Sequence, residues 1–313
     1  MDTKTRTLPA LFLSHGSPMT ALEPREAGAF LQRLGPSITR QFGRPKAILA
    51  ISAHSLTREP VLLAAARHEA VYDFGNFDDR LFTLRYDVAG APALAERVAA
   101  LLKAAGLPAH VVVDGGLDHG IWTPLRYAFP DADIPVLPLA WPPDWTPAQL
   151  FALGRALAPL AARGHGAPPL SSTPPEGGPG ATRPQGPAEG VLIVGSGSIT
   201  HNLRRVFAGG MRPVAEQPAT PESTAFRDWF AARTATGDWP ALLDYRRQAP
   251  HAALMHPTDE HLLPFFVAAG AGGESAPGRR IHASLTYGDL GMDAYAFGAG
   301  ADALVDDEAA VAA

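Results

Sequence analysis

The stretch "PALFLSHGSPMTAL", residues 9–22, joins an apolar run to a turn of small residues that holds His15. The run at 10–14 predicts a buried strand, and the glycine and the Ser-Pro pair that follow predict its abrupt end. Similar short runs recur along the chain, and most are continuously apolar, which is typical of strands covered on both faces. These further predicted strands lie at 46–53, 60–66, 109–114, 134–141 and 191–196.

The segments between several of these runs carry apolar residues at three- and four-residue spacing, which predicts amphipathic helices. They are residues 26–42, 91–106 and 147–164. An alternation of strands and helices favours an α/β fold with a mainly parallel sheet. We therefore expect a three-layer αβα sandwich around a largely parallel, mixed sheet.

Residues 164–190 interrupt this pattern with seven glycines and seven prolines in 27 residues. Such a composition cannot form a hydrophobic core or a strand ladder. The segments on either side look like consecutive elements of one sheet. We therefore expect a single catalytic domain over residues 1–313, with a flexible surface insertion at 164–190 and a frayed C-terminal tail at 302–313.

The composition excludes several classes of protein and site. The chain has no cysteine, so disulfides and thiolate metal sites are absent. A net charge of -5 and the lack of a basic cluster give no reason to expect nucleic acid or a membrane surface as a partner. No apolar run reaches the ~18 residues of a transmembrane helix, and no signal peptide is evident. We expect a soluble, cytoplasmic protein, and the sequence does not predict its oligomeric state.

Three of the eleven histidines follow predicted strands or the turns after them: His15, His54 and His201. Ligands of open α/β sheets bind at the carboxyl ends of the strands, so these three side chains should share one edge. Two further clusters could join them, "GLDHGIW" with Asp118 and His119, and "MHPTDEH" with His256, Asp259, Glu260 and His261.

Neutral imidazole is a common metal ligand, and a mononuclear centre needs about three such donors. A lone histidine at a strand end is more often structural, but the recurrence of the pattern favours a metal site. Five other histidines lack this context, and we assign them structural or surface roles: His68, His110, His165, His251 and His282.

Seven motifs in order along the chain resemble the DOPA 4,5-dioxygenase-type branch of the class III extradiol ring-cleaving dioxygenases. The resemblance runs from about residue 8 to about residue 298 and skips the insertion. The motifs are "LFLSHGSPMTAL", "ISAHS", "YDFGNFDDRLFTLRYDVAG", "GLDHGIWTPLRYAFPDADIPVLPLAW", "VGSGSITHNL", "HPTDEHLLPFFVAAGA" and "SLTYGDLGMDAYAFG".

This resemblance implies a non-haem Fe(II) enzyme that opens a small catechol beside its two hydroxyls with O₂, giving a muconic semialdehyde. It implies one divalent metal ion per chain, Fe(II) for activity with Zn(II) as an occupant in purified protein. The metal ligands would be His15, His54 and His256, with Asp259 and Glu260 as rivals for the third position. The catalytic residues would be His201, as acid and base, and His119, in contact with substrate or oxygen.

Two other functions are compatible with the same histidines. A zinc-dependent hydrolase could use Glu260 as its base, and a non-catalytic relative could bind metal without turnover. The signals for a phosphate loop or a serine nucleophile are weak, because neither the glycine-loop motifs nor G-x-S-x-G occurs. The aromatic segment at 72–86 is read equally well as a pocket wall or as a packed loop.

Overall fold

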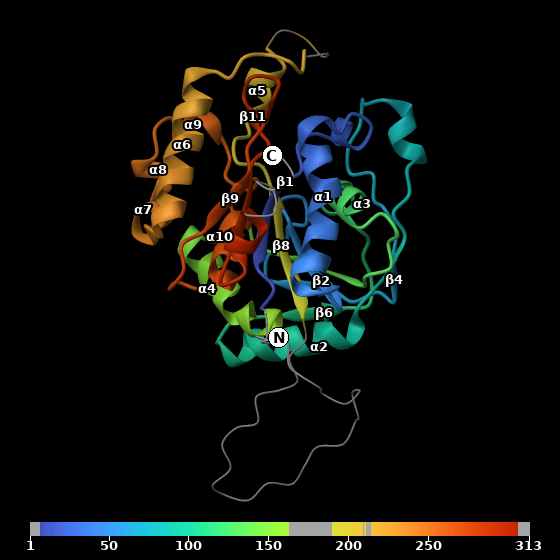
Figure 1. Ribbon diagram of the computed structural model, residues 1–313. Coiled ribbons are helices and arrows are strands. Elements are labelled where there is room, and N and C mark those ends of the chain that lie inside the picture. The colour runs from blue at the N-terminus through green and yellow to red at the C-terminus, as the bar shows by residue number, and fades with distance from the viewer. Residues whose placement is uncertain (1–6, 163–189, 209, 211–213, 306–313) are drawn as a thin grey trace, which may run out of the picture.

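The computed structural model describes residues 7–162, 190–208, 210 and 214–305 (Figure 1). The predicted insertion therefore lies outside the described residues, except for Gly190, and so do the last eight residues of the predicted tail. Residues 301–305, just before them, form a helical turn in which Ala301 and Leu304 are buried.

An eight-stranded mixed sheet runs through the molecule in the order β6-β3-β7-β2-β8-β1-β12-β9. The four central strands β7, β2, β8 and β1 are parallel, whereas β12 is antiparallel to both β1 and β9, and β3 is antiparallel to β7. The strands are β1 Ala10–Ser14, β2 Ala47–Ser52, β3 Val61–Leu63, β6 His110–Val112, β7 Val136–Ala140, β8 Val191–Gly197, β9 Arg279–His282 and β12 Ala294–Phe297.

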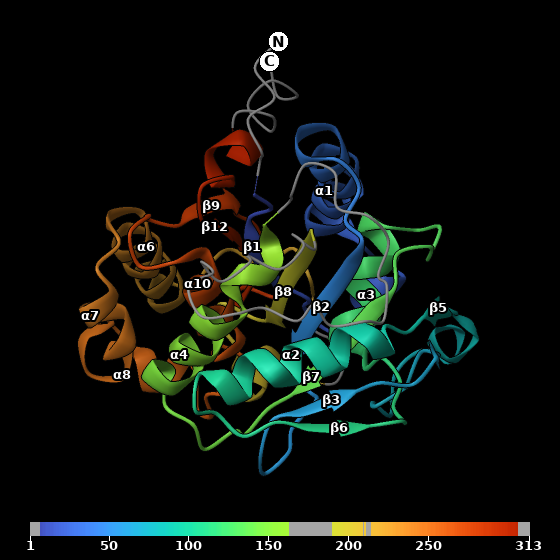
Figure 2. The ribbon, with the colours of Figure 1, turned by 90° about the horizontal axis from the view of Figure 1, so that it is seen from below.

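Side-chain alternation along the central strands divides the core into two apolar layers. On β1, Phe12 belongs to one layer, and Leu11 and Leu13 belong to the other. The first layer is covered by α2 (Pro92–Ala104), α4 (Pro147–Leu157) and α10 (Pro264–Gly272), and the second by α1 (Arg25–Phe42) and α3 (His119–Ala128). Figure 2 shows these two groups of helices on opposite sides of the central strands. The predicted three-layer αβα fold is confirmed.

The helix α10 lies directly against β8, and two glycines of β8 allow this close approach. A Cβ at Gly195 would stand 2.3 Å from the carbonyl oxygen of Pro264, and one at Gly197 would stand 1.9 Å from that of His261. Both distances are far below van der Waals contact. The glycines of "VGSGS" therefore bring the start of α10 to the carboxyl end of the sheet.

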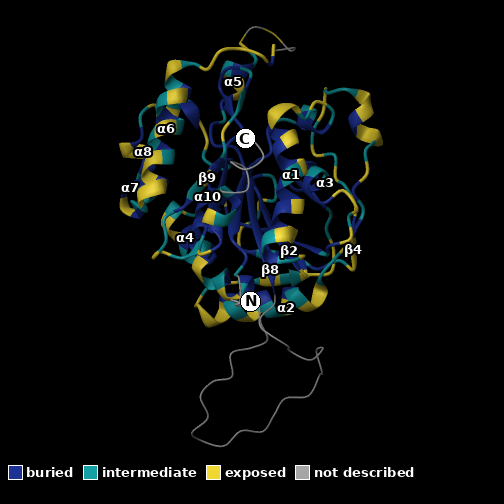
Figure 3. Cartoon of the chain, viewed as in Figure 1, coloured by how far each residue is buried: buried dark blue, intermediate teal, exposed yellow. Residues whose placement is uncertain are grey.

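The remaining elements form an outer layer and the rim of the molecule. Figure 3 shows buried strands at the centre and exposed positions on the outer faces of the helices. No helix in the described ranges is long and apolar enough to span a bilayer. These elements are α5 Leu203–Val206, α6 Pro221–Thr236, α7 Trp239–Leu243, α8 Tyr245–Gln248, α9 Ala252–Met255, the 3-10 helices η1 Pro18–Ala21, η2 Asp79–Thr83 and η3 Ala158–Ala161, and the short strand pairs β4 Arg67–His68 with β5 Val88–Ala89 and β10 Leu285–Thr286 with β11 Leu290–Gly291.

Candidate metal centre

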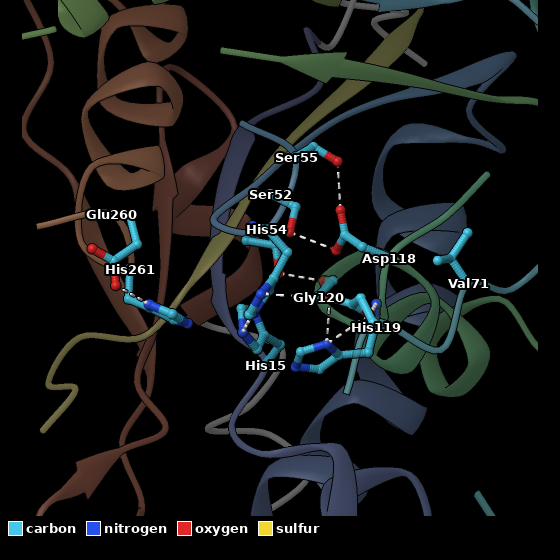
Figure 4. A network of polar contacts seen from close by, with 12 residues as sticks. His15, Ser52, His54, Ser55, Val71, Asp118, His119, Gly120, Glu260 and His261 are labelled. Atoms are coloured by element: carbon cyan, nitrogen blue, oxygen red, sulfur yellow. Dashed lines mark hydrogen bonds and ion pairs between the residues drawn. The ribbon is translucent and has the colours of Figure 1, made fainter. Parts of the chain in front are cut away.

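Five histidines meet at the carboxyl ends of β1, β2 and β8, and we call them the histidine cluster: His15, His54, His119, His201 and His261. His15 directly follows β1, and His119 is the first residue of α3. Ring centroids lie 4.1 Å apart for His54 and His119, and 3.4 Å apart for His201 and His261, which stack face to face. Figure 4 shows His15, His54 and His119 side by side, with His261 facing them from the opposite wall.

Three of these rings have the geometry of a metal ligand set. The Nε2 atoms of His15 and His54 are 3.1 Å apart. Two nitrogens that each bind one ion at about 2.1 Å lie roughly 3.0–3.4 Å from each other, between octahedral and tetrahedral angles. One ring nitrogen from each of His15, His54 and His261 lies within 4.8 Å of the others. The site therefore fits a single divalent ion held by imidazole.

The opposite nitrogens of two of these rings are held by the protein. His15 Nδ1 is 3.0 Å from Ser196 Oγ, and that hydroxyl donates its proton to the carbonyl oxygen of Gly120. His261 Nδ1 is 3.1 Å from Glu260 Oε1. Since a donating hydroxyl and an ionised carboxylate accept the imidazole proton here, both rings carry it on Nδ1. Their Nε2 lone pairs are then available to a metal.

The pKa values of His15, His54 and His201 are depressed. Burial lowers the pKa of His15 well below its usual value, and the neighbouring histidines lower it further. Burial, then the neighbouring His119 and His261, lower the pKa of His54 to about 3. Burial and the facing His261 lower the pKa of His201 to about 2. Near neutral pH these rings are uncharged, which is the form that binds metal.

Asp118 ties the loop that carries His54 to the helix that begins at His119. Its carboxylate accepts a 2.6 Å hydrogen bond from each of Ser52 and Ser55 (Figure 4). Burial raises the pKa of Asp118, and the two serine hydrogen bonds offset only part of that effect. The sequence grouped Asp118 with the candidate site residues, and the structure places it beneath the histidines as a link between two elements.

The structure does not bring His256 into the cluster, although the sequence predicted it as the third ligand. His256 Nε2 donates to the carbonyl oxygen of Ile199 at 3.0 Å, and its ring contacts Phe226. Among the described residues, none of the groups able to hold an ion includes His256. The turn after His256 carries the chain from α9 to α10, so His261, five residues later, reaches the sheet edge instead.

The two carboxylates considered as rival ligands have other partners. Asp259 forms an ion pair with Arg246. Glu260 accepts hydrogen bonds from His261 and Thr258. Burial raises the pKa of Glu260, but the hydrogen bond from His261 and the other donors outweigh burial and lower it to about 2.

Two more groups of described residues could hold an ion, and both overlap the histidine cluster. One consists of His201, Glu260 and His261, and the other of His54, Asp73 and His119. Sequence reasoning did not assign roles to Asp73 or Ser196. The position of His261 did carry a usable signal, because it stands just before the apolar segment that Pro264 opens as a helix.

Comparisons with known proteins agree with this geometry. A family model described as the catalytic LigB subunit of aromatic ring-opening dioxygenase matches residues 9–164. A protein of Beta vulgaris named 4,5-DOPA dioxygenase extradiol is 34% identical over 91% of this chain and 95% of its own length. One of that name from Escherichia coli (strain K12) is 33% identical over 84% of this chain and 85% of its own. The crystal structure of an uncharacterized protein from Escherichia coli K12 matches 94% of this chain and all of that one, with a TM-score of 0.68 and 29% identity.

Proposed function

This chain belongs to the extradiol aromatic ring-opening dioxygenases, and we propose that it cleaves a small catechol, DOPA or a similar one, with O₂ at an Fe(II) ion held by His15, His54 and His261. The observation that carries the ligand assignment is the convergence of three imidazoles, with 3.1 Å between the Nε2 atoms of His15 and His54. The names of the curated relatives support the choice of a catechol.

The set of three imidazole donors also supports a redox-active metal, because it leaves coordination positions open for substrate and O₂. Three imidazoles leave room for both catechol oxygens and for O₂ in a six-coordinate centre. When bound, Fe(II) supplies a Lewis acid through which electrons pass from the catecholate to O₂. Zn(II) fits the same donors and is a second expected occupant, but it cannot change its oxidation state.

We assign His201 the acid and base role. Its ring stacks on His261, and no hydrogen bond to any described residue occupies its ring nitrogens. Its backbone N–H donates to the carbonyl oxygen of Met255 at 2.9 Å, which fixes the backbone of His201 in place. A neutral imidazole beside the ligand shell can accept a proton from a catechol hydroxyl and later return it to a substrate oxygen.

We assign His119 the task of orienting the substrate or O₂. Its side chain is buried, and its Nδ1 faces Asp73 at 3.0 Å, which leaves Nε2 for a ligand. Phe74 meets the His119 ring edge to face, with centroids 5.5 Å apart. This contact supports reading the segment at 72–86 as a pocket wall, where an aromatic ring can pack.

The proposal is tested by loading metal-free protein with Fe(II) without oxygen, then adding O₂ and a panel of catechols. We expect a yellow muconic semialdehyde and uptake of one O₂ per ring opened. Protein loaded with Zn(II) is the matched control, because it keeps the donors but loses the electron transfer. Absence of O₂ uptake with every catechol, together with ester or amide hydrolysis by the zinc form, would support the hydrolase instead.

A further inference from the structure

Asp73 contacts two members of the histidine cluster at once. We propose that Asp73 is a positioning residue that fixes the ring tautomers of both His54 and His119, so that each ring presents an unprotonated Nε2 to the centre. The inference rests on the proposed function, since it assumes that His54 binds the metal and that His119 faces the substrate.

The contacts made by the Asp73 carboxylate carry this inference. Its Oδ1 accepts a 2.9 Å hydrogen bond from the backbone N–H of His119. Both carboxylate oxygens lie 3.0 Å from His119 Nδ1, and Oδ2 lies 3.5 Å from His54 Nδ1. The side chain of Asp73 is 23% exposed, so it is partly shielded from the water that competes for these positions.

The chemistry of a carboxylate then decides the tautomers. An aspartate is ionised near neutral pH, because its ordinary pKa is about 3.9, and the hydrogen bond from the backbone N–H of His119 favours the ionised form. An ionised carboxylate can only accept hydrogen bonds, so the His119 ring that it contacts at 3.0 Å carries its proton on Nδ1. The negative charge 3.5 Å from His54 Nδ1 favours the same tautomer of that ring. For His54 this agrees with its Nε2, which faces His15 Nε2 rather than Asp73.

Contacts of the two residues before Asp73 hold its loop in place. Before it, Val71 donates its N–H to the carbonyl oxygen of Leu117 at 2.7 Å and accepts from Trp122 Nε1 at 3.1 Å. Beside it, the Tyr72 hydroxyl donates to the carbonyl oxygen of Leu84 at 2.5 Å. The carboxylate is thus preorganised, as expected of the groups that orient metal-binding histidines.

Asp73→Asn is the sharpest test, because the amide keeps the shape of the carboxylate but has one acceptor and one donor. With one acceptor atom in place of two, the amide turns an N–H toward one of the ring nitrogens, so one of the two rings must lose its acceptor or move its proton to Nε2. In metal-free protein labelled with ¹⁵N, long-range ¹H–¹⁵N spectra report the tautomer of each ring. We expect Nδ1–H on both rings in the parent and a change at one of them in Asp73→Asn.

Metal affinity is the second readout. We expect Zn(II) and Co(II) to bind Asp73→Asn about 10–100-fold more weakly, the usual cost of losing such a partner. Asp73→Glu keeps two acceptor oxygens and should recover part of the loss. Asp79→Asn is the matched control, since Asp79 is exposed, lies in the same segment and loses the same charge. It should keep parental affinity and tautomers.

Nε2–H on both rings of the parent would overturn the proposal, as would Asp73→Asn protein with unchanged tautomers and affinity. Two ions per chain, one lost on Asp73 substitution, would also overturn it, because Asp73 would then be a ligand with His54 and His119. The parental spectrum decides the tautomers even if Asp73→Asn does not fold. If the tautomers shift as expected but no catechol is cleaved, the role of Asp73 survives and the proposed reaction fails.

Discussion

At the scale of single residues, each candidate metal-binding histidine has a protein group facing its Nδ1 atom, the ring nitrogen that points away from the metal position. Ser196 holds His15, Asp73 faces His54, and Glu260 holds His261. A hydroxyl partner leaves the ring less basic than a carboxylate partner does. We therefore infer that His54 and His261 are the stronger electron donors of the three.

The first prediction separates the two histidines of "HPTDEH". His261→Ala should lose bound metal and activity together, because it removes one of about three donors. His256→Gln should keep its metal, since the glutamine amide can still donate to the carbonyl oxygen of Ile199. The measurement is metal content per chain beside the melting temperature. Metal loss in His256→Gln with retention in His261→Ala would restore His256 as the ligand.

A second prediction concerns the proton-transfer role of His201. His201→Gln should keep metal content near that of the parent, while turnover of a catechol falls about 10²–10⁴-fold, the usual worth of acid–base assistance. His15→Ala is the contrasting variant and should lose metal and activity together. If His201→Gln loses its metal as fully as His15→Ala, then His201 is a ligand. If it keeps full activity, His119 becomes the next candidate.

At the scale of elements, the site depends on how closely α10 approaches β8. Gly197→Ala would place a Cβ 1.9 Å from the carbonyl oxygen of His261, so either the strand or the turn must move. Overpacking of this kind costs about 1–3 kcal/mol of unfolding free energy. Because the displaced carbonyl belongs to His261, we also expect weaker metal binding.

Gly75→Ala is the matched control for this third prediction, because a Cβ there meets no atom within 4 Å. Chemical denaturation and a metal titration of both variants provide the measurement. Equal stability of Gly197→Ala and Gly75→Ala would show that β8 and α10 are not in tight contact.

The same elements show what the sequence could and could not predict. The central strands were predictable because, in a sheet covered on both faces, burial makes each a continuous apolar run. The ends of the predicted strands likewise indicated that His15 and His54 lie at the same edge of the sheet. The choice between His256 and His261 depends on the path of a turn, for which the sequence offers one signal, the place of His261 just before the helix that Pro264 opens. Asp73 escaped notice because its contacts with His54 and His119 cross 19 and 46 positions of the chain.

At the scale of the whole molecule, buried neutral histidines make stability depend on pH. His15, His54 and His201 are such histidines, but His282 offers a probe away from the candidate ligands. It stacks on Phe30 with centroids 4.5 Å apart and contacts Ser284 Oγ at 2.7 Å. Burial, then the charges of Arg33 and Arg227, lower the pKa of His282 to about 4.

The last prediction follows from this depressed pKa. Unfolded His282 takes up a proton near its ordinary pKa of about 6.5, whereas folded His282 does so only near 4. Its contribution to stability is therefore complete above about pH 6.5 and is lost as the pH falls toward 4, because the unfolded chain binds more protons there. His282→Gln should flatten the dependence of unfolding free energy on pH in this window. Denaturation of metal-free parent and variant from pH 4 to 7 measures both slopes, and equal slopes would mean that folded His282 titrates as it does in the unfolded chain.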